Sequence, residues 1–168
     1  MGAGVGPGCG MEQMTVGLCL VAAVGSGLIG GVFFAFSSFV MGALGRLAPG
    51  EGIAAMQAIN VVVLNRSFLG SFFGTGAACV GASAVAIATG NAATILILTA
   101  SAVYLIGVIG VTVACNVPRN ERLAAVSREA SEAAVVWQRY LGEWTMWNHV
   151  RTAAGLLACA LFGLALSG

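Results

Sequence analysis

Five asparagines mark points of potential chemistry in a sequence that is otherwise strongly apolar. They lie in polar segments between apolar runs, or at the boundary of such a run. They are Asn60, Asn65, Asn116, Asn120 and Asn148. An amide side chain both donates and accepts hydrogen bonds, so it can orient an oxygen-bearing ligand. It can also cap a helix, as Asn65 and Asn120 can for the helices expected after them, and the sequence leaves both interpretations open.

Aromatic and polar side chains recur on one face of the expected last helix. At 100° per residue, six of them fall within an arc of roughly 100°. They are Trp137, Tyr140, Trp144, Trp147, Asn148 and Arg151. A belt of aromatics at the membrane boundary does not require a single face, and an arginine at the mouth of a span is costly unless it is paired. The pattern therefore predicts a stripe that faces the bundle, with Glu143 beside it as a partner for Arg139 or Arg151.

These side chains predict a pocket at the arginine-rich end of the bundle. Arg151 is the candidate for stabilising a phenolate or oxyanion, because a guanidinium stays charged when partly buried. Asn148 and Asn116 would orient the oxygen-bearing edge of the ligand. The proton acceptor would be His149 or Tyr140, although His149 lies about 120° from the start of the stripe on the helical wheel. The alternative is a helix-capping network with no room for a ligand.

The walls of this pocket would be aromatic. Trp144 and Trp147 would stack on the rings of a ligand, and Phe36 belongs to a phenylalanine cluster near the end of the first apolar run. Pockets for small molecules are mainly apolar and aromatic with a few polar groups. The remaining lining residues would be Asn60, Asn65, Asn116 and Asn120.

The sequence lacks the ligands of a metal site and the motifs of a nucleotide site. It has one histidine and no aspartate, and its cysteines form neither a CxxC pair nor a disulfide framework. The segment GSGLIG at 25–30 matches GxGxxG, but no strand is expected before it. We therefore expect no metal and no cofactor.

Composition places these residues in a membrane protein. Hydrophobic residues make up 59% of the 168 residues and charged residues 8%, against about 45–50% and about 25% in soluble domains. This balance excludes most soluble enzymes, and a net charge of +1 gives no long-range attraction to nucleic acid. The expected partner is the lipid bilayer, together with an apolar aromatic small molecule. The sequence leaves a homo-oligomer open.

Charge-free runs predict an all-α, up-down bundle of four spans, because each span needs about 20 apolar residues. The expected spans are 15–44, 68–89, 93–116 and 144–167. Pro118 is expected to end the third helix, and the fourth should continue a helix that begins near Ala133. Apolar residues at helical spacing predict a short extra helix over 53–64, between spans one and two. Residues 1–13 would be a flexible leader before a single transmembrane domain, 14–168.

Two further patterns bear on packing and orientation. Gly27 with Gly31, and Gly70 with Gly74, form GxxxG pairs that predict close helix packing. The arginines all fall on one side of the expected bundle, so this side should be cytoplasmic and both termini outside. A composition rich in alanine, glycine and arginine favours a bacterial source, and hence the inner membrane.

Several of these segments together resemble a known family. They are GVFFAFS at 31–37, GIAAMQAIN at 52–60, Asn65, NVPRN at 116–120 and WTMWNHVR at 144–151. Over residues 15–165 the chain resembles the DUF1772 membrane proteins, a superfamily that includes the anthrone oxygenases. The resemblance implies a four-span protein that oxidises polyketide anthrones to anthraquinones with O2, without metal or flavin. It transfers no catalytic residues, because the family has no settled set.

The sequence thus supports two classes of function. The first is a cofactor-independent monooxygenase acting on an anthrone-like or other apolar phenolic compound. The second is a non-catalytic membrane subunit or a module that binds lipid or a small molecule. A proton-coupled exporter is disfavoured, because no span carries an acidic residue at its centre.

Overall fold

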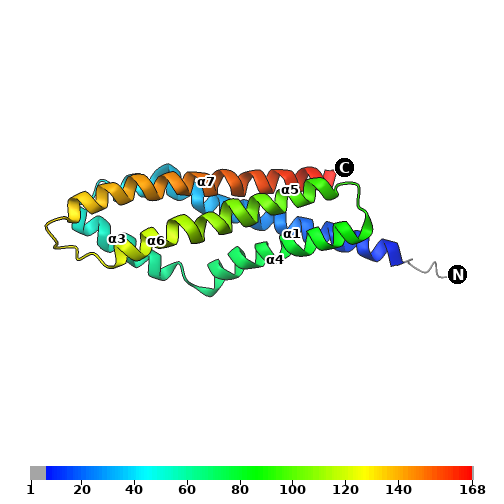
Figure 1. Cartoon of the computed structure of the whole chain (residues 1–168), viewed down its shortest axis with the longest axis horizontal. Helices are drawn as coiled ribbons and strands as arrows, with labels where there is room; N and C mark the ends of the chain where they lie inside the picture. The colour runs from blue at the N-terminus through cyan, green and yellow to red at the C-terminus, as the bar shows by residue number, and fades with distance from the viewer. Residues whose placement is uncertain (1–6, 168) are drawn as a thin grey trace.

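The computed structural model describes residues 7–167, and within this range it contains helices and no strand. Four long helical segments pack side by side, each running opposite to the one before it (Figure 1). They are Gly10–Leu44, Arg66–Thr89, Thr94–Ala124 and Ala133–Ser167, each long and apolar enough to cross a membrane. The expected all-α bundle of four membrane helices is therefore confirmed.

The first segment is three helical pieces in one line: α1 (Pro7–Ala35), the π-helix η1 (Phe36–Val40) and α2 (Met41–Leu44). Helix α1 begins inside the range 1–13 that the sequence assigned to a leader, and residues 1–6 lie outside the described range. Proline suits a first helical turn, because its missing N–H has no partner there in any case.

The short helix expected between the first two spans is present as α3 (Pro49–Val62). It has proline in its first turn and buries Ile53 and Met56. Gly52 lies against Trp137 of the last helix so closely that an added Cβ would come within 2.5 Å of the indole ring. Helix α3 is thus seated on the last helix through a glycine that no larger residue can replace without displacement.

Helices α4 (Arg66–Thr89) and α5 (Thr94–Tyr104) form a hairpin. Asn65 caps α4, since its Oδ1 accepts a hydrogen bond of 2.9 Å from the Phe68 N–H. The hairpin turns at Gly90, where φ is 61°, a left-handed conformation that glycine adopts without strain.

The third segment continues past Pro118, contrary to the expectation that this proline ends it. After α5 come the π-helices η2 (Leu105–Gly110) and η3 (Thr112–Asn116), and then α6 (Val117–Ala124). The Val117 N–H bonds to the Thr112 carbonyl, five residues back. The wider π turn accommodates a proline that lacks its own N–H, so the helix survives it.

The last helix, α7 (Ala133–Ser167), packs most closely on α1. A Cβ added at Gly155 would lie 2.9 Å from the Gly30 Cα. Of the two predicted GxxxG pairs, only Gly27 faces a neighbour, the Cys159 sulfur. Among the residues described, nothing comes within 4 Å of a Cβ added at any of the other three. The packing expectation was wrong for those three, because α1 and α4 turn other faces to their neighbours.

The bundle has two distinguishable ends (Figure 1). The turn end holds Gly90, the start of α1 and the end of α7. The arginine end holds α3 and the connection 125–132. A core of mostly small and aliphatic residues fills the bundle toward the turn end, and a second core at the arginine end contains Trp137, Tyr140 and Trp144.

Candidate functional site

The stripe on α7 faces the bundle, as its spacing predicts. Trp137, Tyr140, Trp144, Asn148 and Arg151 are all buried. The rings of Trp137 and Tyr140 stack with centroids 5.8 Å apart, and those of Tyr140 and Trp144 lie 6.2 Å apart. This aromatic row runs along α7 from the arginine end toward Arg151.

Phe36 of the π-helix η1 adds a fourth ring to this row. Its centroid lies 5.7 Å from that of Trp144. Phe36 therefore packs against the aromatic row, and its role as a pocket wall stays a prediction. The neighbouring Phe34 and Phe39 are exposed on the outer surface of the bundle, where lipid would contact them.

Asn148 is the junction between α7 and the first segment. Its Nδ2 donates to the Phe33 carbonyl and to the Ser37 hydroxyl, both at 2.7 Å. Its Oδ1 accepts a hydrogen bond of 2.7 Å from Arg151. The amide is fully buried, so it fixes the arginine in place while tying the two helices together.

Arg151 is a buried cation without a counter-ion. Its side chain donates to Asn148 and, at 3.3 Å, to Thr112 of η3. The guanidinium carbon lies 4.1 Å from the Phe33 ring centroid and 5.1 Å from that of Trp144. Among the residues described, no carboxylate comes within 4 Å of it, and its Nε has no hydrogen-bond partner.

Burial of this charge is energetically unusual. Arg151 is 4% exposed and lies sixteen residues before Ser167, about 24 Å along the helix axis at about 1.5 Å per residue. A charge at membrane depth is costly unless it is paired, and such residues mark sites for ions or substrates by default. Contact with aromatic faces offsets part of the cost. The arrangement is a buried guanidinium held on a rigid support with one N–H left without a partner among the described residues.

Asn116 carries a second buried polar atom without a hydrogen-bond partner among the described residues, in addition to Arg151 Nε. It is 1% exposed, and its Nδ2 donates to the Trp144 carbonyl at 3.3 Å. Within residues 7–167 its Oδ1 has no partner. The same is true of the indole N–H of Trp147, whose ring lies 6.0 Å from the Arg119 guanidinium.

These residues surround one point where α1, α7 and the third segment meet. We call them the Arg151 cluster, defined by Phe33, Ser37, Thr112, Asn116, Trp144, Asn148 and Arg151. All three π-helical stretches lie at or next to this meeting point. π-helical turns inside α-helices frequently lie at functional sites, so the backbone irregularity and the buried polar atoms without partners point to the same place.

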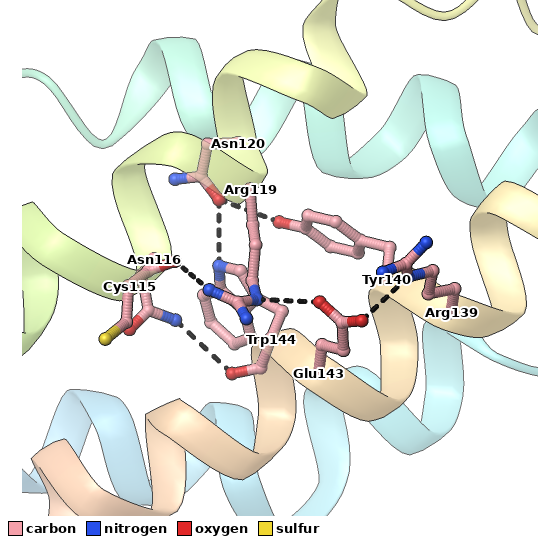
Figure 2. Close-up of polar contacts among 8 residues, drawn as sticks. All are labelled: Cys115, Asn116, Arg119, Asn120, Arg139, Tyr140, Glu143 and Trp144. Carbon is pink, nitrogen blue, oxygen red and sulfur yellow. Dashed lines mark hydrogen bonds and ion pairs between the residues drawn. The ribbon is translucent and has the colours of Figure 1, made fainter.

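A second group of polar side chains lies closer to the arginine end (Figure 2). Asn120 Oδ1 accepts from the Tyr140 hydroxyl at 2.9 Å and from the Trp144 indole at 2.8 Å. Asn60 lies close to the same hydroxyl. Two buried donors here, Asn60 Nδ2 and Trp137 Nε1, have no partner in the described part of the chain.

Glu143 joins two arginines at the edge of this group. It accepts from Arg119 at 3.1 Å and from Arg139 at 2.7 Å (Figure 2). Arg119 also donates to the Cys115 carbonyl at 2.7 Å. Of the two partners expected from the sequence, Glu143 therefore takes Arg139 and not Arg151.

The structure leaves three predicted site residues outside these groups. Trp147 is half-buried, and its ring lies near Arg119 and not in the Arg151 cluster. His149 is exposed on α7 and does not face the Arg151 cluster. Asn65 is exposed and caps α4. Sequence reasoning in turn missed Ser37, Thr112 and Gln57, although Phe33 with Ser37 and Thr112 with Asn116 share the i, i+4 spacing that places residues on one helix face.

Gln57 belongs to the scaffold. Its Nε2 donates to the carbonyls of Leu123 and Val126, at 2.9 and 3.1 Å. It thereby holds α3 to the end of α6. No spacing pattern in the sequence predicts this contact between α3 and the end of α6.

Two hollows open on the surface of the bundle, and neither is lined by the predicted pocket residues. One, of about 550 Å³, lies between the start of α3 and the connection that contains Arg128 and Glu129. The other, of about 650 Å³, is an open apolar depression between α5 and α7, with Gly107 and Ala154 in its floor. The pocket predicted along the stripe stays a prediction.

Comparison with known proteins identifies the family. No curated protein and no solved structure matches the chain. The family model described as anthrone oxygenase matches residues 60–161, more than half of the chain. The matched segment contains Asn116, Asn148 and Arg151 and excludes Phe33 and Ser37. With four apolar helices that indicate an integral membrane protein, the chain belongs to the anthrone oxygenase family, DUF1772.

Proposed function

We propose that this protein is a membrane monooxygenase that needs no cofactor and oxidises an anthrone-like or other apolar phenolic compound with O2. One observation carries the proposal. Arg151 is buried and held by Asn148, and no carboxylate within residues 7–167 neutralises it. Family membership supplies the reaction class, and the unpaired guanidinium supplies a place where a substrate anion is stabilised.

The reaction converts a methylene to a carbonyl, so that one methylene group and one O2 give one ketone and one water. Loss of one proton from a methylene flanked by aromatic rings gives an anion delocalised onto the ketone oxygen. This anion transfers one electron to O2, and the resulting radical pair combines to form a C–O bond. Protonation gives a hydroperoxide, which loses water. One oxygen atom enters the product and the other leaves in water.

Arg151 would lower the barrier by holding the oxygen on which negative charge develops. A fixed donor in a dry site stabilises such charge more than water does, because it needs no reorganisation during the reaction. Asn148 would act as a positioning residue, since its Oδ1 holds the guanidinium at 2.7 Å. Trp144 and Phe36 present aromatic faces to a planar ligand at the same point.

The geometry narrows the choice of proton acceptor. His149 is exposed and turned away from the Arg151 cluster. Tyr140 is buried in the aromatic row, and its hydroxyl donates to Asn120. Of the two candidates, we propose Tyr140 as the proton acceptor: its phenolate takes the proton from the substrate carbon and becomes the phenol that donates to Asn120.

The second candidate function is non-catalytic: a membrane subunit or a module that binds lipid or a small molecule. It is favoured by the close internal bonding of Asn148, which uses both amide hydrogens and its oxygen within the chain. The two surface hollows also lie away from this residue. In this case the cluster would serve assembly of the bundle or of a complex, homo-oligomers included.

Oxygen uptake distinguishes the two functions. Purified protein in lipid nanodiscs, treated with a metal chelator and free of flavin, is mixed with an anthrone while O2 and product are followed together. We expect one O2 consumed per quinone formed, and loss of uptake in Arg151→Met. Arg66→Met is the matched control, because Arg66 is exposed at the start of α4. No uptake above the protein-free rate by the wild type would overturn the oxygenase proposal.

We also propose an orientation: the arginine end in the cytoplasm, both termini outside, in a bacterial inner membrane. It is supported by the arginines that border the segments joining spans one to two and three to four, while Glu12 is the charge near the start of α1, at the turn end. A reporter fused after residue 168 tests it. Activity of a reporter that works only in the cytoplasm would reverse the orientation.

A further inference from the structure

Two unmatched atoms in the Arg151 cluster are chemically complementary. Arg151 Nε is a donor and Asn116 Oδ1 is an acceptor, and neither has a partner within residues 7–167. Their side chains are 4% and 1% exposed. Leaving such an atom buried and unbonded is unfavourable, so a donor and an acceptor left unbonded beside the same residues indicate a ligand group that satisfies both.

The two residues lie next to the same two neighbours, Thr112 and Trp144. Asn116 lies four residues after Thr112 on η3, and Arg151 donates to Thr112. Both also contact Trp144, Asn116 at its carbonyl and the guanidinium near its ring. A single oxygen atom of a ligand beside Trp144 is therefore the natural partner for both.

The Asn116 Oδ1 acceptor restricts the kind of ligand oxygen that can bind here. At Arg151 Nε, an oxyanion would place negative charge against the Asn116 carbonyl oxygen, which repels it, so the substrate oxyanion is left to the terminal N–H groups of the guanidinium. An oxygen that carries a hydrogen satisfies both, because it accepts from arginine and donates to the amide. In the proposed reaction, the intermediate with such an oxygen is the hydroperoxide, whose outer oxygen carries the hydrogen of the C–O–O–H group.

We infer that Asn116 is a catalytic residue for the loss of water from this hydroperoxide. The inference rests on the proposed oxygenase function. The Asn116 Oδ1 accepts the hydrogen of the outer oxygen, and Arg151 donates to the same oxygen. The pair holds the leaving group while the inner oxygen stays bonded to carbon.

The step balances without another oxidant. A base removes the remaining proton from the carbon, and the electron pair of that C–H bond forms the second bond of C=O. The O–O bond breaks, and its electron pair leaves on the outer oxygen as hydroxide, which takes up the proton as water. Arg151 stabilises the charge that develops on this oxygen, and Asn116 fixes the direction of the O–H bond.

The test measures the ratio of trapped hydroperoxide, recovered as alcohol, to ketone. A purely structural role of Asn116 would not change this ratio. Wild type, Asn116→Leu and Gln57→Leu are given one equivalent of substrate with O2 in nanodiscs. Samples are quenched with triphenylphosphine, which reduces hydroperoxide to alcohol, and alcohol and ketone are quantified. Gln57→Leu removes a structural amide that bonds only backbone carbonyls among the described residues, so it controls for loss of packing.

We expect Asn116→Leu to consume O2 and to raise the alcohol-to-ketone ratio by up to about tenfold, with KM little changed, since a hydrogen bond between uncharged groups contributes at most about that factor. Gln57→Leu should keep the wild-type ratio even if its melting temperature falls. A wild-type ratio in Asn116→Leu would overturn the inference. If the wild type itself consumes no O2, the proposed function has failed and not the role of Asn116.

A second variant tests the inference independently in case Asn116→Leu does not fold. In Asn116→Asp the side chain keeps its size, and its carboxylate should pair with Arg151 and close the site. We expect this variant to melt no lower than wild type and to lose O2 uptake. Full uptake with the wild-type product ratio would contradict the inference, because the carboxylate would then not reach the guanidinium.

Discussion

The two ends of the bundle treat buried polar groups differently. Toward the turn end, hydroxyls between α4 and α5 donate to backbone carbonyls: Ser101 to Cys79 at 3.0 Å, and Tyr104 to Phe72 at 2.9 Å. From Arg151 to the arginine end, buried polar atoms without a partner in the described chain accumulate. They are Asn60 Nδ2, Asn116 Oδ1, Trp137 Nε1, Trp147 Nε1 and Arg151 Nε, with Ser26 Oγ the one example toward the turn end.

This difference separates scaffold from candidate site. Interhelical hydrogen bonds that satisfy every group stabilise a membrane bundle. Groups left unbonded destabilise it, and natural proteins retain such groups where strain, a bound water or ion, a ligand or a reaction accounts for them. The contrast predicts that substitutions toward the turn end change stability alone, whereas those in the Arg151 cluster change activity more than stability.

The largest effect is expected for Arg151→Met. We expect kcat/KM for O2-dependent oxidation of an anthrone to fall by about 100-fold or more, the range for removal of an oxyanion donor. The melting temperature in detergent should change little, because replacing an uncompensated buried charge with an apolar chain is often neutral or stabilising. A large fall in melting temperature with retained activity would make Arg151 a scaffold residue.

Asn148→Leu should affect both properties. It removes bonds to the Phe33 carbonyl and the Ser37 hydroxyl, and frees Arg151 from its fixed position. We expect a loss of about 2–4 kcal/mol in the free energy of unfolding, together with loss of activity. Denaturant melts and O2 uptake measure the two. A stable but inactive variant would indicate that positioning of Arg151 outweighs the link between α1 and α7.

The sequence predicted the spans and the α7 stripe, because both depend on local pattern. Charge-free length decides whether a segment crosses the bilayer, and the 100° spacing of Tyr140, Trp144 and Arg151 decides which face they share. The π-helices and the partners of Asn148 depend on how helices cross, and one sequence does not specify that crossing. For the same reason Gly31, Gly70 and Gly74 were expected at interfaces that the structure does not form.

Tyr104→Phe tests the turn end. It removes a fully buried hydroxyl that donates to the Phe72 carbonyl, so we expect a loss of about 0.5–1.5 kcal/mol in the free energy of unfolding. Activity at saturating substrate should equal that of wild type. A fall in kcat larger than the change in folded fraction would extend the functional region into the scaffold half and break the comparison.

The smallest effect is expected at the surface of the arginine end, where Glu143 bonds two arginines of unequal burial. The Arg139 side chain is 75% exposed and that of Arg119 22%. An exposed ion pair is screened by water and salt, so Arg139→Gln should leave the melting temperature unchanged. Arg119→Gln should lower it measurably, because Arg119 also bonds the Cys115 carbonyl and lies near the Trp147 ring. Equal shifts for the two variants would mean that the shared contact with Glu143 dominates and that burial of Arg119 adds nothing.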